Sequence, residues 1–84
     1  MVFLAITASG LTQAIALAKV QRFPIWCGSD ALSESEHKEL VGVDLSRFTY
    51  PLKGEASDVV VGALETIAEH HPGETIWVES NGSL

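Results

Sequence analysis

The sequence has little cysteine and no long apolar run, and each shortage excludes a class of protein. Cys27 is the only cysteine, so no disulfide can form within the chain, whereas small secreted domains usually contain several cysteines. The first residues, Met1 to Ile6, are apolar, but a run of this length without a basic stretch is too short for a signal peptide or a membrane span. The sequence therefore predicts a soluble, cytoplasmic protein that makes no membrane contact.

Positive charge is also scarce. Five basic residues face eleven acidic ones, which gives a formal net charge of −6. The basic residues stand singly along the chain at Lys19, Arg22, Lys38, Arg47 and Lys53. Phosphate backbones are bound by clustered lysine and arginine side chains, so no nucleic-acid partner is predicted.

The sequence likewise lacks an assembled set of metal ligands or catalytic groups. A zinc site needs three or four ligands, and His37, His70, His71 and Cys27 show no such spacing. The adjacent pair His70 and His71 is typical of a helix C-terminus, where the helix dipole favours positive charge. No metal, cofactor or catalytic residue is predicted.

What the chain does contain is enough apolar material for one small core. Apolar residues make up 46% of the 84 residues, close to the average of globular domains. There is no linker, repeat or low-complexity segment within the first 79 residues. We expect a single domain over residues 1–79, followed by a flexible tail over residues 80–84.

Apolar periodicity predicts four strands that alternate with helices. The expected strands cover residues 2–7, 23–27, 47–50 and 75–79, and the expected helices cover residues 11–21, 34–41 and 57–71. Ser9 is the expected N-cap of the first helix, and Ser33 with Glu36 has the spacing of a capping box before the second.

This order favours a small α/β fold with a mostly parallel four-stranded sheet. Residues 2–7 are apolar on both faces, which is typical of a central strand covered by helices on both sides. A two-layer α/β sandwich with a mixed sheet is the alternative, because only two of the three helices are long.

Small and polar residues follow the first two strands. Ser9 and Gly10 follow the first strand, and Cys27, Gly28 and Ser29 end the second, with Asp30 next to them. In a parallel sheet these positions share the carboxyl edge, where ligands bind. They form the predicted site for a small molecule or an anion such as phosphate, although no glycine-rich phosphate motif is present.

A separate hypothesis concerns Cys27 as a reactive thiol. The stretch from Trp26 to Ser29 resembles one half of a thioredoxin-type redox motif, with Asp30 in place of the second cysteine. A thiol enzyme would use Cys27 as its nucleophile and would need a base, for which His37 is the candidate.

Aromatic residues on the expected strands support the leading hypothesis. Trp26, Tyr50 and Trp77 are more than a domain of this size buries easily, and exposed tryptophan and tyrosine are enriched at protein interfaces. With no catalytic set and with open sheet edges expected, the sequence favours a non-enzymatic interaction or regulatory module that binds a protein partner, most simply as a homodimer.

Overall fold

The computed structural model describes residues 1–54 and 57–79, so the predicted tail over residues 80–84 lies outside the described residues. The elements follow one another as predicted, strand and helix in alternation. Their bounds are β1 Val2–Ala5, α1 Ala8–Gln21, β2 Ile25–Cys27, α2 Glu34–Glu39, β3 Leu45–Arg47, α3 Ser57–His70 and β4 Ile76–Val78.

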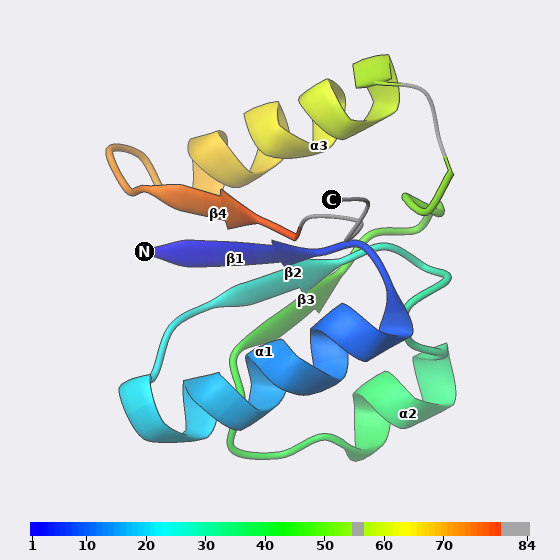
Figure 1. Ribbon diagram of the computed structural model, residues 1–84, viewed down its shortest axis with the longest axis vertical. Coiled ribbons are helices and arrows are strands. Elements are labelled where there is room, and N and C mark those ends of the chain that lie inside the picture. Colours follow the sequence, from blue (N-terminus) through cyan, green and yellow to red (C-terminus); the bar gives the residue numbers. More distant parts are fainter. Residues whose placement is uncertain (55–56, 80–84) are drawn as a thin grey trace.

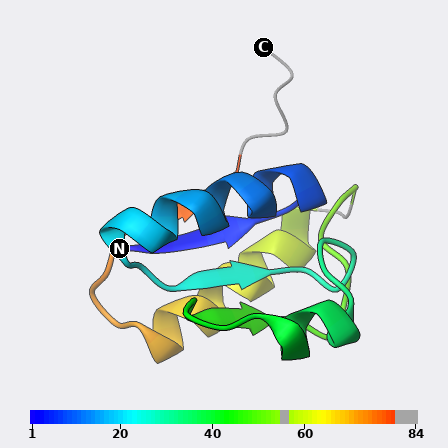
Figure 2. The same ribbon diagram turned by 90° about the horizontal axis from the view of Figure 1, so that it is seen from below.

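The four strands form one parallel sheet in the order β3-β2-β1-β4 (Figures 1 and 2). Phe3 of β1 pairs with Ile25 of β2 on one side and with Trp77 of β4 on the other. This confirms the parallel sheet that the sequence favours, and the mixed-sheet alternative is wrong. The two long helices suffice because each covers a different face.

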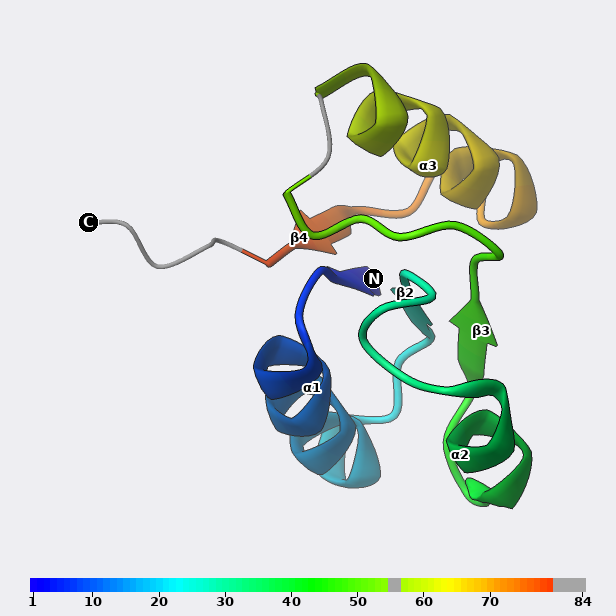
Figure 3. The ribbon, with the colours of Figure 1, turned by 90° about the vertical axis from the view of Figure 1, so that its right-hand side faces the viewer.

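The helices lie in two layers around the sheet (Figure 3). α3 covers one face, while α1 and α2 lie on the other. Among the described residues, no helix combines the length and the apolar character needed to cross a membrane.

Strand β1 is buried on both faces. Ala5 belongs to the apolar cluster under α1, together with Leu11 and Ala14 of that helix. Val2 and Leu4 point the other way and pack with Ile67 of α3, and both are fully buried. Residues 2–7 are therefore apolar on both faces because β1 is a central strand between two helical layers.

The first helix begins earlier than expected. Thr7, and not Ser9, is the N-cap: its backbone is extended and its Oγ1 accepts a hydrogen bond from the Gly10 N–H at 3.0 Å. Ser9 lies exposed in the first helical turn. Because serine and threonine are both good caps, the sequence alone does not distinguish the two positions.

The third strand is shifted towards the N-terminus of its predicted range. It covers Leu45–Arg47 instead of residues 47–50. The shift follows from pairing with β2, which ends at Cys27; the Phe48 N–H donates the last ladder bond to the Cys27 carbonyl. Tyr50 lies beyond the strand in a bend, and its carbonyl accepts from the Ser29 N–H.

The second helix has the predicted capping box. Ser33 Oγ accepts from the Glu36 N–H at 3.1 Å, and Glu36 Oε1 accepts from the Ser33 N–H at 3.2 Å. The helix ends at Glu39, two residues before the expected end, and none of its residues is buried.

Candidate functional site

The topology creates a switch point between β1 and β4. From β1 the chain moves through α1 to β2 on one side, and after β3 it crosses the opposite face through α3 to reach β4 on the other side of β1. At the carboxyl edge, which faces the viewer in Figure 3, the chain leaves β1 towards α1 on one face of the sheet, while α3, which leads to β4, covers the other face. In open parallel sheets such a point leaves a crevice where ligands bind.

A cleft of about 410 Å³ lies at this switch point. Its apolar lining comes from Ile6, Leu52, Val60 and Val78, and its remaining lining from Thr7, Lys53, Gly54 and Glu79. An apolar cleft with a few polar side chains is the usual composition of a small-molecule site. We call it the switch-point cleft.

The carboxylate of Glu79 is held firmly at one wall of the cleft. Its Oε1 accepts hydrogen bonds from the Ile6 N–H at 2.6 Å and from the Thr7 N–H at 2.8 Å. Its Oε2 accepts from the Thr7 hydroxyl at 2.6 Å. The first turn of α1 contains no acidic residue. Glu79 thus supplies, from the far end of the sequence, the negative charge that a helix N-terminus favours.

Gly10 allows this approach. A Cβ atom at position 10 would collide with the Glu79 carboxylate. Thr7 joins the two groups, because its hydroxyl donates to Glu79 while its oxygen accepts from the Gly10 N–H. The turn after β1, where many α/β folds bind an anionic ligand, here holds a carboxylate of the protein itself.

Asp30 positions the opposite wall. Its carboxylate accepts hydrogen bonds from the backbone N–H groups of Leu52 at 3.2 Å and Lys53 at 3.1 Å. Gly28 lies under the same segment, and a Cβ atom there would approach the Leu52 nitrogen to 2.8 Å. The loop after β2 thereby sets the place of the segment that lines the cleft.

The residues predicted as a ligand site are otherwise distributed over the carboxyl edge. Ser9 is exposed, while Gly10 and Gly28 are buried against their neighbours. The Ser29 N–H donates to Tyr50, and the Ser29 carbonyl accepts from Arg47 Nη2 at 3.1 Å. None of these predicted residues is among the described residues that line the cleft. The lining residues are instead neighbours of the predicted ones, along the sequence or in space.

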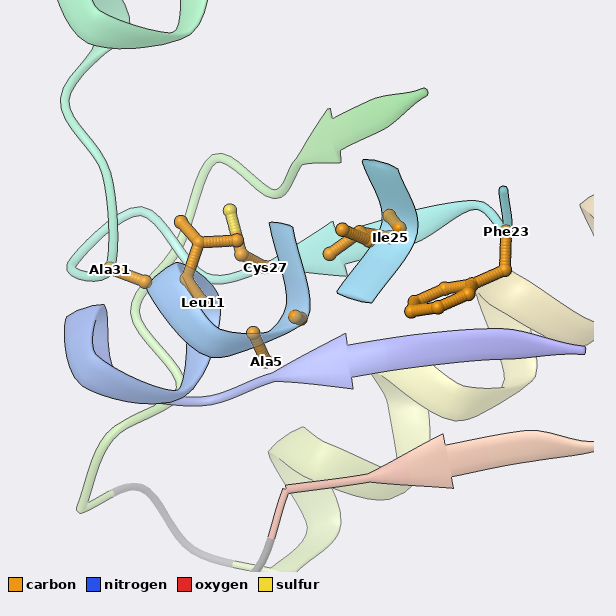
Figure 4. Close-up of a cluster of buried hydrophobic side chains, with 8 residues drawn as sticks. Ala5, Leu11, Phe23, Ile25, Cys27 and Ala31 are labelled. Carbon is orange, nitrogen blue, oxygen red and sulfur yellow. The ribbon is translucent and has the colours of Figure 1, made fainter. Parts of the chain in front are cut away.

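Cys27 lies in the core beneath α1, near Leu11 (Figure 4). Its side chain is fully buried. Burial raises the pKa of the thiol to about 11, the charge of Arg47 lowers it in part, and the charge of Asp30 raises it. The ring of His37 contacts the Leu45 carbonyl at 2.9 Å. A nucleophilic cysteine needs solvent access and a lowered pKa, and Cys27 has neither.

Two of the three aromatic residues predicted at an interface are half-buried on the α3 face. The Trp26 ring lies 5.2 Å from those of Phe48 and His70, and its Nε1–H donates to His71 Nε2 at 3.3 Å. The ring of Tyr50 lies 5.1 Å from that of Phe48. These contacts are packing within the domain.

Trp77 differs, because 55% of its surface is exposed. It lies in β4, the edge strand next to β1, and shares the α1 face with its register partner Phe3. Val78, on the α3 face of the same strand, is 43% exposed. We call the outer side of Ile76–Val78 the β4 edge.

One backbone group of the other sheet edge, in β3, is covered. The Ile25 N–H bonds to the Asp44 carbonyl and the Phe48 N–H to Cys27, so the polar backbone groups of Leu45 point outward from the sheet. The side chain of His37 extends from α2, and its ring contacts the Leu45 carbonyl. Helix α2 thus covers one outward-facing carbonyl of the β3 edge.

The sequence did not point to Lys53 or Glu79, and it placed Thr7 in the candidate turn after the first strand without giving that residue a role of its own. Part of the cleft could be inferred from the sequence, because Thr7 follows β1 and Glu79 follows β4. Both residues therefore belong to the carboxyl edge of a parallel sheet. What the sequence could not supply was the strand order, which places β4 beside β1 and not beside β3.

Among residues 1–54 and 57–79, no group of three or more His, Cys, Asp or Glu side chains is arranged to hold a metal ion. Comparison with known proteins found no matching family model, no matching curated protein and no matching solved structure.

Proposed function

We propose that this chain is a non-catalytic interaction module that pairs with a second copy of itself through the β4 edge. The observation that carries the proposal is the exposed Trp77 on an edge strand whose outward backbone groups form no hydrogen bond with a helix of the described residues. An uncovered edge strand presents free backbone donors and acceptors, which favour pairing with another strand.

The backbone geometry of β4 suits a twofold antiparallel pairing. The Val2 N–H bonds to the Thr75 carbonyl and the Glu79 N–H to the Leu4 carbonyl, so alternate residues of β4 face β1. The N–H and C=O groups of Ile76 and Val78 therefore point outward. Ile76 of one copy would pair with Val78 of the other, and the two Trp77 side chains would meet across the twofold axis in a close, non-hydrogen-bonded pair.

Charge favours the same surface. Residues 75–78, Thr-Ile-Trp-Val, carry no charge in a chain whose net charge is −6, so the paired segment itself adds no like-charge repulsion. The strand is short, and the contact falls in the small class of interfaces. A weak dimer with a dissociation constant of about 10 to 100 μM is expected.

Sedimentation velocity tests the proposal on the full chain. Between about 5 μM and about 500 μM, the wild-type protein should shift from monomer to dimer, because this range brackets the expected affinity. Trp77→Lys should remain monomeric, since it places like charges directly opposite each other at the twofold axis.

The matched control is Val20→Lys, which makes the same charge change on the exposed surface of α1. It should dimerise like the wild type. Val78→Pro is a second test, because it removes only an outward-facing N–H group and should also abolish the dimer. A wild-type mass that stays monomeric throughout, or a Trp77→Lys protein that dimerises normally, would contradict the proposal.

A further inference from the structure

We propose that the switch-point cleft binds a small organic cation, with a primary ammonium group at Glu79 and a short apolar body between Ile6, Leu52 and Val60. This inference is independent of self-association. It rests on the volume of the cleft, on its apolar walls and on the charge of Glu79.

The polar wall of the cleft is an anion without a cationic partner. Among residues 1–54 and 57–79, the donors to the Glu79 carboxylate are all neutral: two backbone N–H groups and the Thr7 hydroxyl. Among the described residues, no lysine, arginine or histidine forms an ion pair with it. A carboxylate offers about four acceptor positions, and three are used here, so one remains for a ligand.

The same bonds argue against an anionic ligand. The Ile6 and Thr7 N–H groups, just before α1, already bond to Glu79, and the Gly10 N–H bonds to the Thr7 hydroxyl oxygen. An anion that used these three donors would have to displace their hydrogen bonds, and it would meet the negative charge of Glu79. An ammonium group instead gains a charge-assisted bond without breaking any of them.

The remaining walls define the size of the ligand. Ile6, Leu52, Val60 and Val78 provide apolar surface, and the volume of about 410 Å³ lies near the lower end of small-molecule sites. A straight chain of about six carbons fits such a space. Lys53 is exposed and is the one basic residue among the described residues of the lining, so its positive charge opposes the binding of a cation.

A matched set of probes tests the head group. Hexylammonium, hexanoate and 1-hexanol share the apolar chain and differ in charge. In a titration followed by amide chemical shifts, hexylammonium should produce saturable shifts at Ile6, Thr7 and Leu52. Hexanol should bind more weakly, and hexanoate should produce no shifts at these residues. Hexanoate shifts as large as those of hexylammonium would overturn the proposal.

Variants test the residues. Glu79→Gln should weaken hexylammonium binding at least about tenfold, because the amide cannot form an ion pair. The matched control Glu65→Gln makes the same charge change on the exposed side of α3 and should leave the affinity unchanged. Equal losses in both variants would show a general effect of net charge and would refute the site.

Two further variants test the same site even if the Glu79→Gln protein fails to fold. Lys53→Met should raise the affinity for hexylammonium, because it removes the opposing positive charge. Val60→Phe should abolish binding by filling the cleft while leaving every hydrogen bond of Glu79 in place. Retention of hexylammonium binding in Val60→Phe would place the probe elsewhere and overturn the proposal.

Discussion

The thiol of Cys27 lies among apolar side chains of β1, β2 and α1. An ion is poorly solvated there, so the protonated form is favoured. At this position a cysteine packs as a small apolar residue. The ionisation of its thiol is then seen only in the pH dependence of the folding stability.

This leads to a prediction for alkaline pH. The unfolded chain releases the Cys27 proton near the ordinary pKa of 9.0, whereas the folded chain retains it up to about 11. The stabilisation from this group is therefore complete below pH 9.0 and is lost as the pH rises to about 11. The loss in unfolding free energy is of the order of 3 kcal/mol.

Urea unfolding at a series of alkaline pH values measures this loss. Cys27→Ala is the comparison, because the difference between the two proteins removes the contribution of lysine and tyrosine titration. The wild type should lose its stability advantage over Cys27→Ala as the pH rises. Parallel pH profiles for the two proteins would show that the thiol titrates normally in the folded state.

At the scale of elements, periodicity and capping predicted the type and order of every helix and strand. The capping box at Ser33 was predictable because it depends on residues three apart. The place of β3 was not, because it depends on which residues of β2 lie opposite. The cleft could not be predicted from the sequence for the same reason. Thr7 and Glu79 are 72 residues apart, and the strand order alone brings them together.

Helix α2 offers the sharpest test of a local element. None of its residues is buried, so its stability depends largely on the Ser33 cap. Ser33→Ala removes the acceptor for the Glu36 N–H and should destabilise the helix by about 1 kcal/mol. Amide hydrogen exchange across residues 34–39 should accelerate accordingly.

Ser35→Ala is the control, because Ser35 is exposed inside the same helix and alanine is favourable there. It should leave exchange unchanged or slow it. If both substitutions accelerate exchange equally, the cap does not hold the helix. Loss of α2 would also free the outward-facing Leu45 carbonyl of β3 from His37.

At the scale of the whole molecule, the net charge of −6 acts on the two proposals in opposite directions. Two copies repel each other, and salt screens this repulsion, so self-association should become tighter with ionic strength. A small cation is attracted by the same field, so its binding should become weaker.

Both trends can be measured by repeating the sedimentation and titration experiments from about 0.01 M to about 0.15 M salt, a range over which the Debye length falls from about 30 Å to about 8 Å. The opposite signs are the expected outcome. Self-association that weakens with salt would indicate that ion pairs, and not the uncharged β4 edge, hold the copies together.

The position of β1 in the middle of the sheet also has a consequence for the protein during its synthesis. Val2 and Leu4 are synthesised before the helix that covers them, α3, and before the strand that flanks them, β4, because both of these elements come after residue 56. Until α3 and β4 are made, one face of the nascent sheet therefore exposes apolar side chains. A chaperone that shields short apolar segments would find its target in β1 during this interval.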